Sequence, residues 1–87
     1  MLVMTFTDCL RALRRETGKT QQVFSTELGI GLRTYAGYET GRMPSAPRIY
    51  AFERAAVTVG RPDLADAFHQ TLADVMGPGF PRARRRR

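Results

Sequence analysis

The chain has 87 residues, of which 43% are hydrophobic and 25% charged, as expected for one small globular domain. No apolar run approaches the roughly 18 residues of a membrane span. The single cysteine excludes an internal disulfide, and one cysteine with one histidine cannot form a zinc site. We therefore expect no metal, no cofactor and no membrane association. Because residues 1–5 lack the features of a secretory signal, we expect a cytoplasmic protein.

The net charge of +6 is concentrated near the C-terminal end of the sequence. Five of the fourteen Lys and Arg residues lie in residues 80–87, and outside that segment nine basic residues face eight acidic ones. A basic tail attracts polyanions, usually nucleic acid, although it can also serve only to keep a protein in solution. Residues 77–87 begin with Gly-Pro-Gly-Phe-Pro and are predicted to form a linker and a flexible Arg-rich tail.

The first predicted helix covers about residues 6–17. Its apolar residues recur at spacings of three and four and are Phe6, Cys9, Leu10 and Leu13. Thr5 can cap its N-terminus, and Asp8 places an acid in its first turn. Gly18 can end it in the left-handed conformation.

Two short helices are predicted next, over about residues 21–28 and 32–39. Thr20 caps the first of them, whose expected buried residues are Val23, Phe24 and Leu28. Gly29 lies in the turn between the two helices, where a residue must adopt a positive φ. Tyr35 and Tyr38 are expected to face inward from the second helix.

Two longer helices complete the prediction. Ser45 can cap a fourth helix and Pro47 fits its first turn; its expected buried residues are Ile49, Phe52 and Ala56. The fifth helix covers about residues 62–76, with apolar residues at Leu64, Phe68, Leu72, Val75 and Met76. This stripe can close the core of the monomer, but it is wide enough to reach a second subunit as well. We expect residues 1–76 to form one domain whose last helix dimerises through Leu64, Phe68, Leu72 and Val75.

Residues 20–44 carry the pattern that is most informative about function. Two short helices joined by a glycine turn form a helix-turn-helix, which places its second helix in the major groove of DNA. Ser25 is small enough for a close crossing of the two helices. The sequence also has no sustained alternation of apolar and polar residues, so strands are not expected. The expected fold is an all-α domain of five helices.

Three segments of this region resemble a known family. They are Thr20-Gln21-Gln22-Val23-Phe24-Ser25, Leu28-Gly29-Ile30, and Tyr38-Glu39-Thr40-Gly41-Arg42-Met43-Pro44. They are similar to the S-Q-x-x-L-A, L-G-V and Y-E-N-G-x-x-P patterns of the Cro/C1-type (XRE) helix-turn-helix family, which includes the lambda-like repressors. The resemblance covers about residues 6–59 and implies a lambda-repressor-like fold.

The resemblance also implies residue roles. The positions that face base edges are Leu32, Arg33, Thr34 and Gly37. Gln21 would contact a phosphate or support a base-reading side chain, and Thr40 and Arg42 would hold the DNA backbone. Arg14 and Glu39 match a buried ion pair of several family members. Charge adds a further set of expected phosphate contacts: Arg84, Arg85, Arg86 and Arg87.

Two of the base-facing positions depart from what direct readout needs. The side chains of Leu32 and Gly37 cannot hydrogen-bond a base, although a leucine can touch a thymine methyl group. Arg33 is therefore the main candidate for reading a base, through guanine O6 and N7. Specificity would then depend partly on DNA shape or on the basic tail.

The expected function is that of a sequence-specific transcriptional regulator without enzymatic activity. A small dimeric repressor that binds a palindromic operator, in some cases in its own operon, is typical of phage and mobile-element regulators. An antitoxin with the same fold would instead have a toxin protein as its partner. A protein- or RNA-binding module that has lost base readout is the third possibility, which Leu32 and Gly37 favour.

Overall fold

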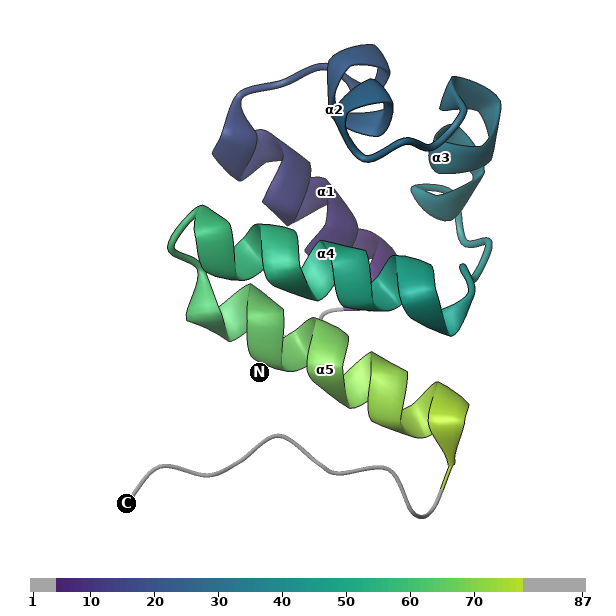
Figure 1. The fold of residues 1–87 in the computed structure, drawn as a ribbon, viewed down its shortest axis with the longest axis vertical. Helices are drawn as coiled ribbons and strands as arrows, with labels where there is room; N and C mark the ends of the chain where they lie inside the picture. The colour runs from purple at the N-terminus through teal and green to yellow at the C-terminus, as the bar shows by residue number, and fades with distance from the viewer. Residues whose placement is uncertain (1–4, 78–87) are drawn as a thin grey trace. The chain divides into compact units, whose positions relative to one another are not determined.

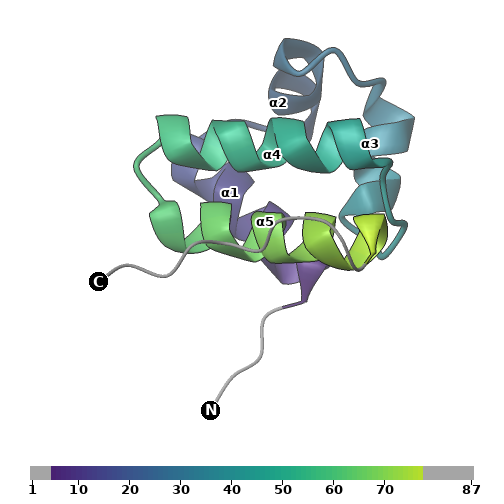
Figure 2. The ribbon, with the colours of Figure 1, turned by 60° about the horizontal axis from the view of Figure 1, so that its bottom comes forward.

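The structure, a computed structural model, describes residues 5–77 of the chain (Figures 1 and 2). This range contains five helices and no strand: α1 (Phe6–Thr17), α2 (Gln21–Glu27), α3 (Leu32–Tyr38), α4 (Ala46–Thr58) and α5 (Pro62–Met76). The predicted all-α fold with five helices is therefore confirmed. One compact unit contains α1, α2 and α3, and a second contains α4 and α5. None of these helices combines the length and the apolar character needed to cross a membrane.

The sequence determines both ends of α1. The Thr5 side chain accepts a hydrogen bond from the Asp8 backbone N–H at 3.1 Å, and the Asp8 carboxylate accepts one from the Thr5 N–H at 3.1 Å. This reciprocal pair is a capping box, which satisfies two backbone donors at the start of the helix. At the other end Gly18 has a φ of 73° and its N–H donates to the Arg15 carbonyl. The predicted cap and stop are both present.

A tight turn joins α2 to α3. The Ile30 N–H donates to the Ser25 carbonyl at 2.9 Å and the Gly29 N–H to the Thr26 carbonyl at 3.1 Å. This pair of bonds is a Schellman motif, in which the residue after the helix takes a left-handed conformation, and Gly29 has a φ of 73°. Ile30 is buried, which anchors the turn beneath the two helices.

Replacing Gly29 with alanine is expected to lower the free energy of unfolding by about 1–2 kcal/mol, because an L-residue is strained at positive φ. Crowding is not the cause, since a β-carbon would meet no atom within 4 Å at either Gly29 or Gly31. Gly31, the N-cap of α3, has a φ of −62°, so Gly31→Ser is the matched control and should leave stability unchanged or slightly raised. Urea unfolding measures both variants, and equal losses would contradict the role given to Gly29.

The core of the first unit brings α2 and α3 together. The rings of Phe24 and Tyr35 meet edge to face, with centroids 5.7 Å apart. Ser25 is completely buried, and its hydroxyl donates to the Gln22 carbonyl, so this polar group is satisfied. The prediction that Val23 is buried is wrong: its side chain is 45% exposed. Neighbouring positions on a helix point about 100° apart, and in this two-turn helix Phe24 and Ser25 occupy the inner face.

The second unit is a pair of packed helices, α4 and α5, which lie side by side in both views (Figures 1 and 2). Phe52 and Phe68 pack against each other with ring centroids 5.9 Å apart. The buried apolar residues of the unit are Ile49, Phe52, Ala56, Leu64, Ala65, Phe68, Leu72 and Ala73. The apolar stripe of α5 is no longer buried in the last turn of the helix, where Val75 and Met76 are exposed.

Candidate nucleic-acid interface

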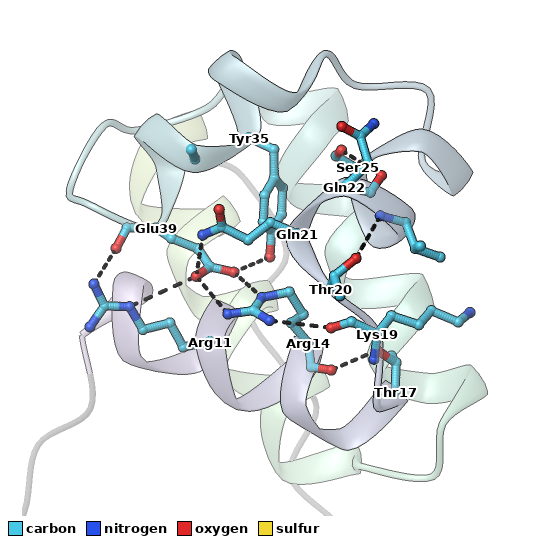
Figure 3. A network of polar contacts seen from close by, with 12 residues as sticks. Arg11, Arg14, Thr17, Lys19, Thr20, Gln21, Gln22, Ser25, Tyr35 and Glu39 are labelled. Atoms are coloured by element: carbon cyan, nitrogen blue, oxygen red, sulfur yellow. Dashed lines mark hydrogen bonds and ion pairs between the residues drawn. The ribbon is translucent and has the colours of Figure 1, made fainter.

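Glu39, directly after α3, is the centre of a polar network that joins all three helices of the first unit (Figure 3). Arg14 of α1 donates from Nε to Glu39 Oε2 at 2.7 Å and from Nη2 to Oε1 at 3.3 Å. Gln21 of α2 donates from Nε2 to Oε1 at 3.0 Å. The Tyr35 hydroxyl of α3 donates to Oε2. One carboxylate thus holds the helix-turn-helix against α1.

Arginine side chains also bind main-chain carbonyls around this network. Arg11 Nη2 donates to the Glu39 carbonyl at 2.8 Å, and Arg14 Nη1 donates to the Lys19 carbonyl at 3.2 Å. These bonds fix the end of α3 and the segment between α1 and α2. No buried side-chain nitrogen or oxygen within residues 5–77 lacks a hydrogen-bond partner.

The ionisation of this cluster follows from its contacts. Burial alone would raise the pKa of Glu39, but hydrogen bonds from Arg14, Tyr35 and Gln21 outweigh it and lower that pKa below its usual value. Burial, together with the hydrogen bond to Glu39, raises the pKa of the Tyr35 hydroxyl. Hydrogen bonding to Glu39 raises the pKa of Arg14, against the opposing effect of burial. The network is therefore a charged carboxylate surrounded by protonated donors.

The helix that would enter the groove, α3, has one anchored side and one open side. Tyr35, Tyr38 and the following Glu39 are buried. The positions predicted to face base edges lie elsewhere on the helix: Leu32 and Arg33 are exposed, and Thr34 and Gly37 are half-buried. A recognition helix needs this division, because the residues that hold the helix in place cannot also reach DNA.

Two arginines near this open side have free charged groups. No side-chain hydrogen bond or ion pair within the described range holds the guanidinium of Arg33 or Arg42, and both residues are exposed. Thr40 is also exposed, and its hydroxyl donates to the Gly37 carbonyl at 3.0 Å. The amide of Gln21 donates to Glu39, which leaves it less available for a phosphate contact, one of the two roles expected from the resemblance.

The other predicted residues belong to α5 or to the C-terminal tail. Leu64, Phe68 and Leu72 are buried within the chain, whereas Val75 is 48% exposed. Of the four expected dimer contacts, only Val75 therefore presents substantial surface to a second subunit. The four tail arginines, Arg84, Arg85, Arg86 and Arg87, lie outside the described residues.

Besides the bond from Gln21, the sequence did not indicate that Arg11, Tyr35 and Lys19 contribute polar groups to the network. Arg11 shares a face of α1 with Arg14, three residues on, and this spacing could have indicated a common target. Tyr35 was expected only to face inward, although a buried tyrosine hydroxyl usually has a hydrogen-bond partner. Lys19 takes part only through its carbonyl, for which side-chain chemistry gives no indication.

Comparison with known families identifies the chain's relatives. The model of a helix-turn-helix family matches residues 10–55, which is more than half of the chain and includes α2, the Gly29 turn, α3 and Glu39. Comparison with curated proteins and with solved structures gives no match. The Schellman turn and the anchored α3 both lie within the matched segment and form the helix-turn-helix that the family model describes. The chain therefore belongs to the Cro/C1-type helix-turn-helix (XRE) family of DNA-binding regulators, with a lambda-repressor-like all-α fold.

Proposed function

We propose that this protein is a transcriptional repressor that binds a palindromic DNA site as a homodimer through α3. The observation that carries the proposal is the division of α3 into an anchored face and an open face. Occupying a promoter and so blocking it is the simplest way in which a bound helix-turn-helix protein regulates transcription. A regulator of its own operon, as in phage or mobile elements, fits this mode of action.

Base readout is assigned to the exposed part of α3. No partner among residues 5–77 holds the guanidinium of Arg33, which can donate two hydrogen bonds to guanine O6 and N7. Leu32, 40% exposed, can contact a thymine methyl group, and Thr34 can hydrogen-bond a base or a phosphate. Thr40, at the end of the helix, and the arginines beyond the described range add phosphate contacts, which give affinity without sequence information.

Dimerisation is assigned to the C-terminal end of α5. Val75 and Met76 are the large apolar residues exposed there, at 48% and 55%. They extend the buried stripe of Leu64, Phe68 and Leu72 in the same helix, which makes them the natural continuation of the apolar surface. On a palindromic site, each copy of α3 in such a dimer would occupy one half-site, and the half-sites would lie one helical turn, about 34 Å, apart.

Replacing Arg33 with alanine tests the proposed readout. Bound fragments selected from random duplexes define the preferred site of the wild-type protein. On that site we expect Arg33→Ala to weaken binding by about 1–3 kcal/mol and to remove the preference at one base pair per half-site. Arg54→Ala is the matched control, because it removes the same charge from an exposed position of α4. We expect it to change the base-pair preference little.

One outcome would contradict this function, and another would contradict only the role given to Arg33. If the wild-type protein selects no sequence, α3 is not a base reader. If Arg33→Ala weakens the selected duplex and a scrambled duplex equally, Arg33 contacts a phosphate.

A protein-binding role, including that of an antitoxin, is the second candidate, because Val23, Leu32 and Met43 expose apolar surface on the unit that contains α3. A stable complex with a second protein would favour it.

A further inference from the structure

Gly37 has no side chain, but the space beside it is occupied. A β-carbon added at Gly37 would lie 3.5 Å from Cδ and 3.8 Å from Cβ of Arg42, which is ordinary van der Waals contact. The aliphatic stem of Arg42 therefore lies directly beside the place where a side chain at position 37 would begin. The family resemblance makes position 37 one of those that face base edges.

The backbone around Arg42 holds this stem in place. The Arg42 N–H donates to the Gly37 carbonyl at 2.9 Å, and the Thr40 N–H donates to the same oxygen at 3.1 Å. Gly41, with a φ of 120°, reverses the chain between them. Arg42 is thus attached to Gly37 through both its main chain and its stem, and it lies against the last turn of α3 although it comes after the helix.

We propose that Arg42 is a specificity-determining residue whose guanidinium contacts a base edge in place of the side chain that Gly37 lacks. This inference rests on the proposed role of α3 as the DNA reader. The guanidinium is bonded to Cδ, the atom nearest to the missing β-carbon, so it starts from the part of α3 that would face the bases. No partner within the described range holds it.

The fixed stem distinguishes a base contact from the phosphate contact that the family resemblance implies for Arg42. Phosphate oxygens line both edges of the groove, and a mobile cation reaches them without a fixed register. An arginine presents a planar, rigid pair of donors that matches guanine O6 and N7, whereas a lysine presents a point charge on a flexible stem. A stem already ordered by Gly37 also loses less conformational entropy on binding.

The test compares base preferences of the wild-type protein, Arg42→Ala, Arg42→Lys and Arg33→Ala on the selected site and its single-base-pair variants. We expect Arg42→Ala and Arg42→Lys both to weaken the selected duplex about 5- to 150-fold. Both should lose preference at one base pair, different from the one lost in Arg33→Ala. Thermal unfolding should be unchanged, since the Arg42 side chain is exposed.

The proposal is overturned if Arg42→Ala weakens selected and scrambled duplexes by the same factor and Arg42→Lys restores both, which is the behaviour of a phosphate contact. In that case the wild-type protein still selects a sequence and Arg33→Ala still changes it, so the proposed function stands. A wild-type protein that selects no sequence overturns the proposed function and this assignment together.

Discussion

Replacing Glu39 with alanine is expected to lower the free energy of unfolding by about 3–5 kcal/mol, the range for a buried ion pair that loses one partner. Glu39 is 2% exposed and accepts hydrogen bonds from Arg14, Gln21 and Tyr35. Its removal leaves a cation, an amide and a buried hydroxyl without their acceptor. Urea or thermal unfolding measures the loss, and DNA binding should weaken only as far as the folded fraction falls.

Glu27→Ala is the matched control for this prediction. Glu27 pairs with Lys19 on the surface of the same unit, where side-chain exposures are 51% and 38%. Exposed pairs of this kind contribute about 0–1 kcal/mol. If Glu39→Ala and Glu27→Ala are equally stable, the network does not hold the unit together.

The same network makes the free energy of unfolding depend on pH. Because the pKa of Glu39 is lowered on folding, its stabilising contribution is present above the unfolded-state pKa and is lost as pH falls through the folded-state pKa. The wild-type protein should therefore lose stability in acid below the ordinary glutamate value of 4.5, and Glu39→Gln should lose less over that range. Unfolding free energies over a pH series measure the difference, and parallel curves would exclude this role for Glu39.

Truncating Leu72 to alanine should lower the free energy of unfolding by about 2–5 kcal/mol, because Leu72 is 6% exposed and its loss leaves a cavity beside α4 and α5. Val75 lies one turn further along α5 and is 48% exposed, so Val75→Ala should change stability by less than about 0.5 kcal/mol. Urea unfolding compares the two variants. Equal losses would contradict the division of α5 into a buried stripe and an exposed end.

Val75→Asp then separates dimerisation from folding. A charge at this exposed position leaves the core intact but places an unpaired carboxylate in the proposed interface. Sedimentation should show a folded monomer with weakened binding to a palindromic site. An unchanged dimer would place the interface on another surface.

Local sequence rules predicted the helices and their ends. The Thr5–Asp8 capping box and the turns at Gly18 and Gly29 depend on residues that are close in the sequence, so composition and spacing suffice. Apolar spacing was less reliable at the edges of packed surfaces. The exposed side chain of Val23 shows this, because periodicity indicates a helix face but not how far its neighbour covers that face.

The site was harder to predict because its contacts are distant in the sequence. The family resemblance implied that Arg14 and Glu39 form an ion pair, and Arg14 Nε lies 2.7 Å from Glu39 Oε2. It gave no indication that Gln21 and Tyr35 donate to the same carboxylate. Bringing three donor side chains to one carboxylate depends on the packing of three helices. The position of the Arg42 stem over Gly37 depends on a chain reversal at Gly41, which spacing alone does not reveal.

The anchored face of α3 has a consequence for how such a protein can change its target. Tyr35, Tyr38 and Glu39 attach the helix from one side, while Leu32 and Arg33 are exposed. Substitutions at the open positions therefore carry little folding penalty. A library randomised there would consist mostly of folded proteins. Under the proposed readout by α3, new binding preferences could then evolve or be engineered without rebuilding the domain.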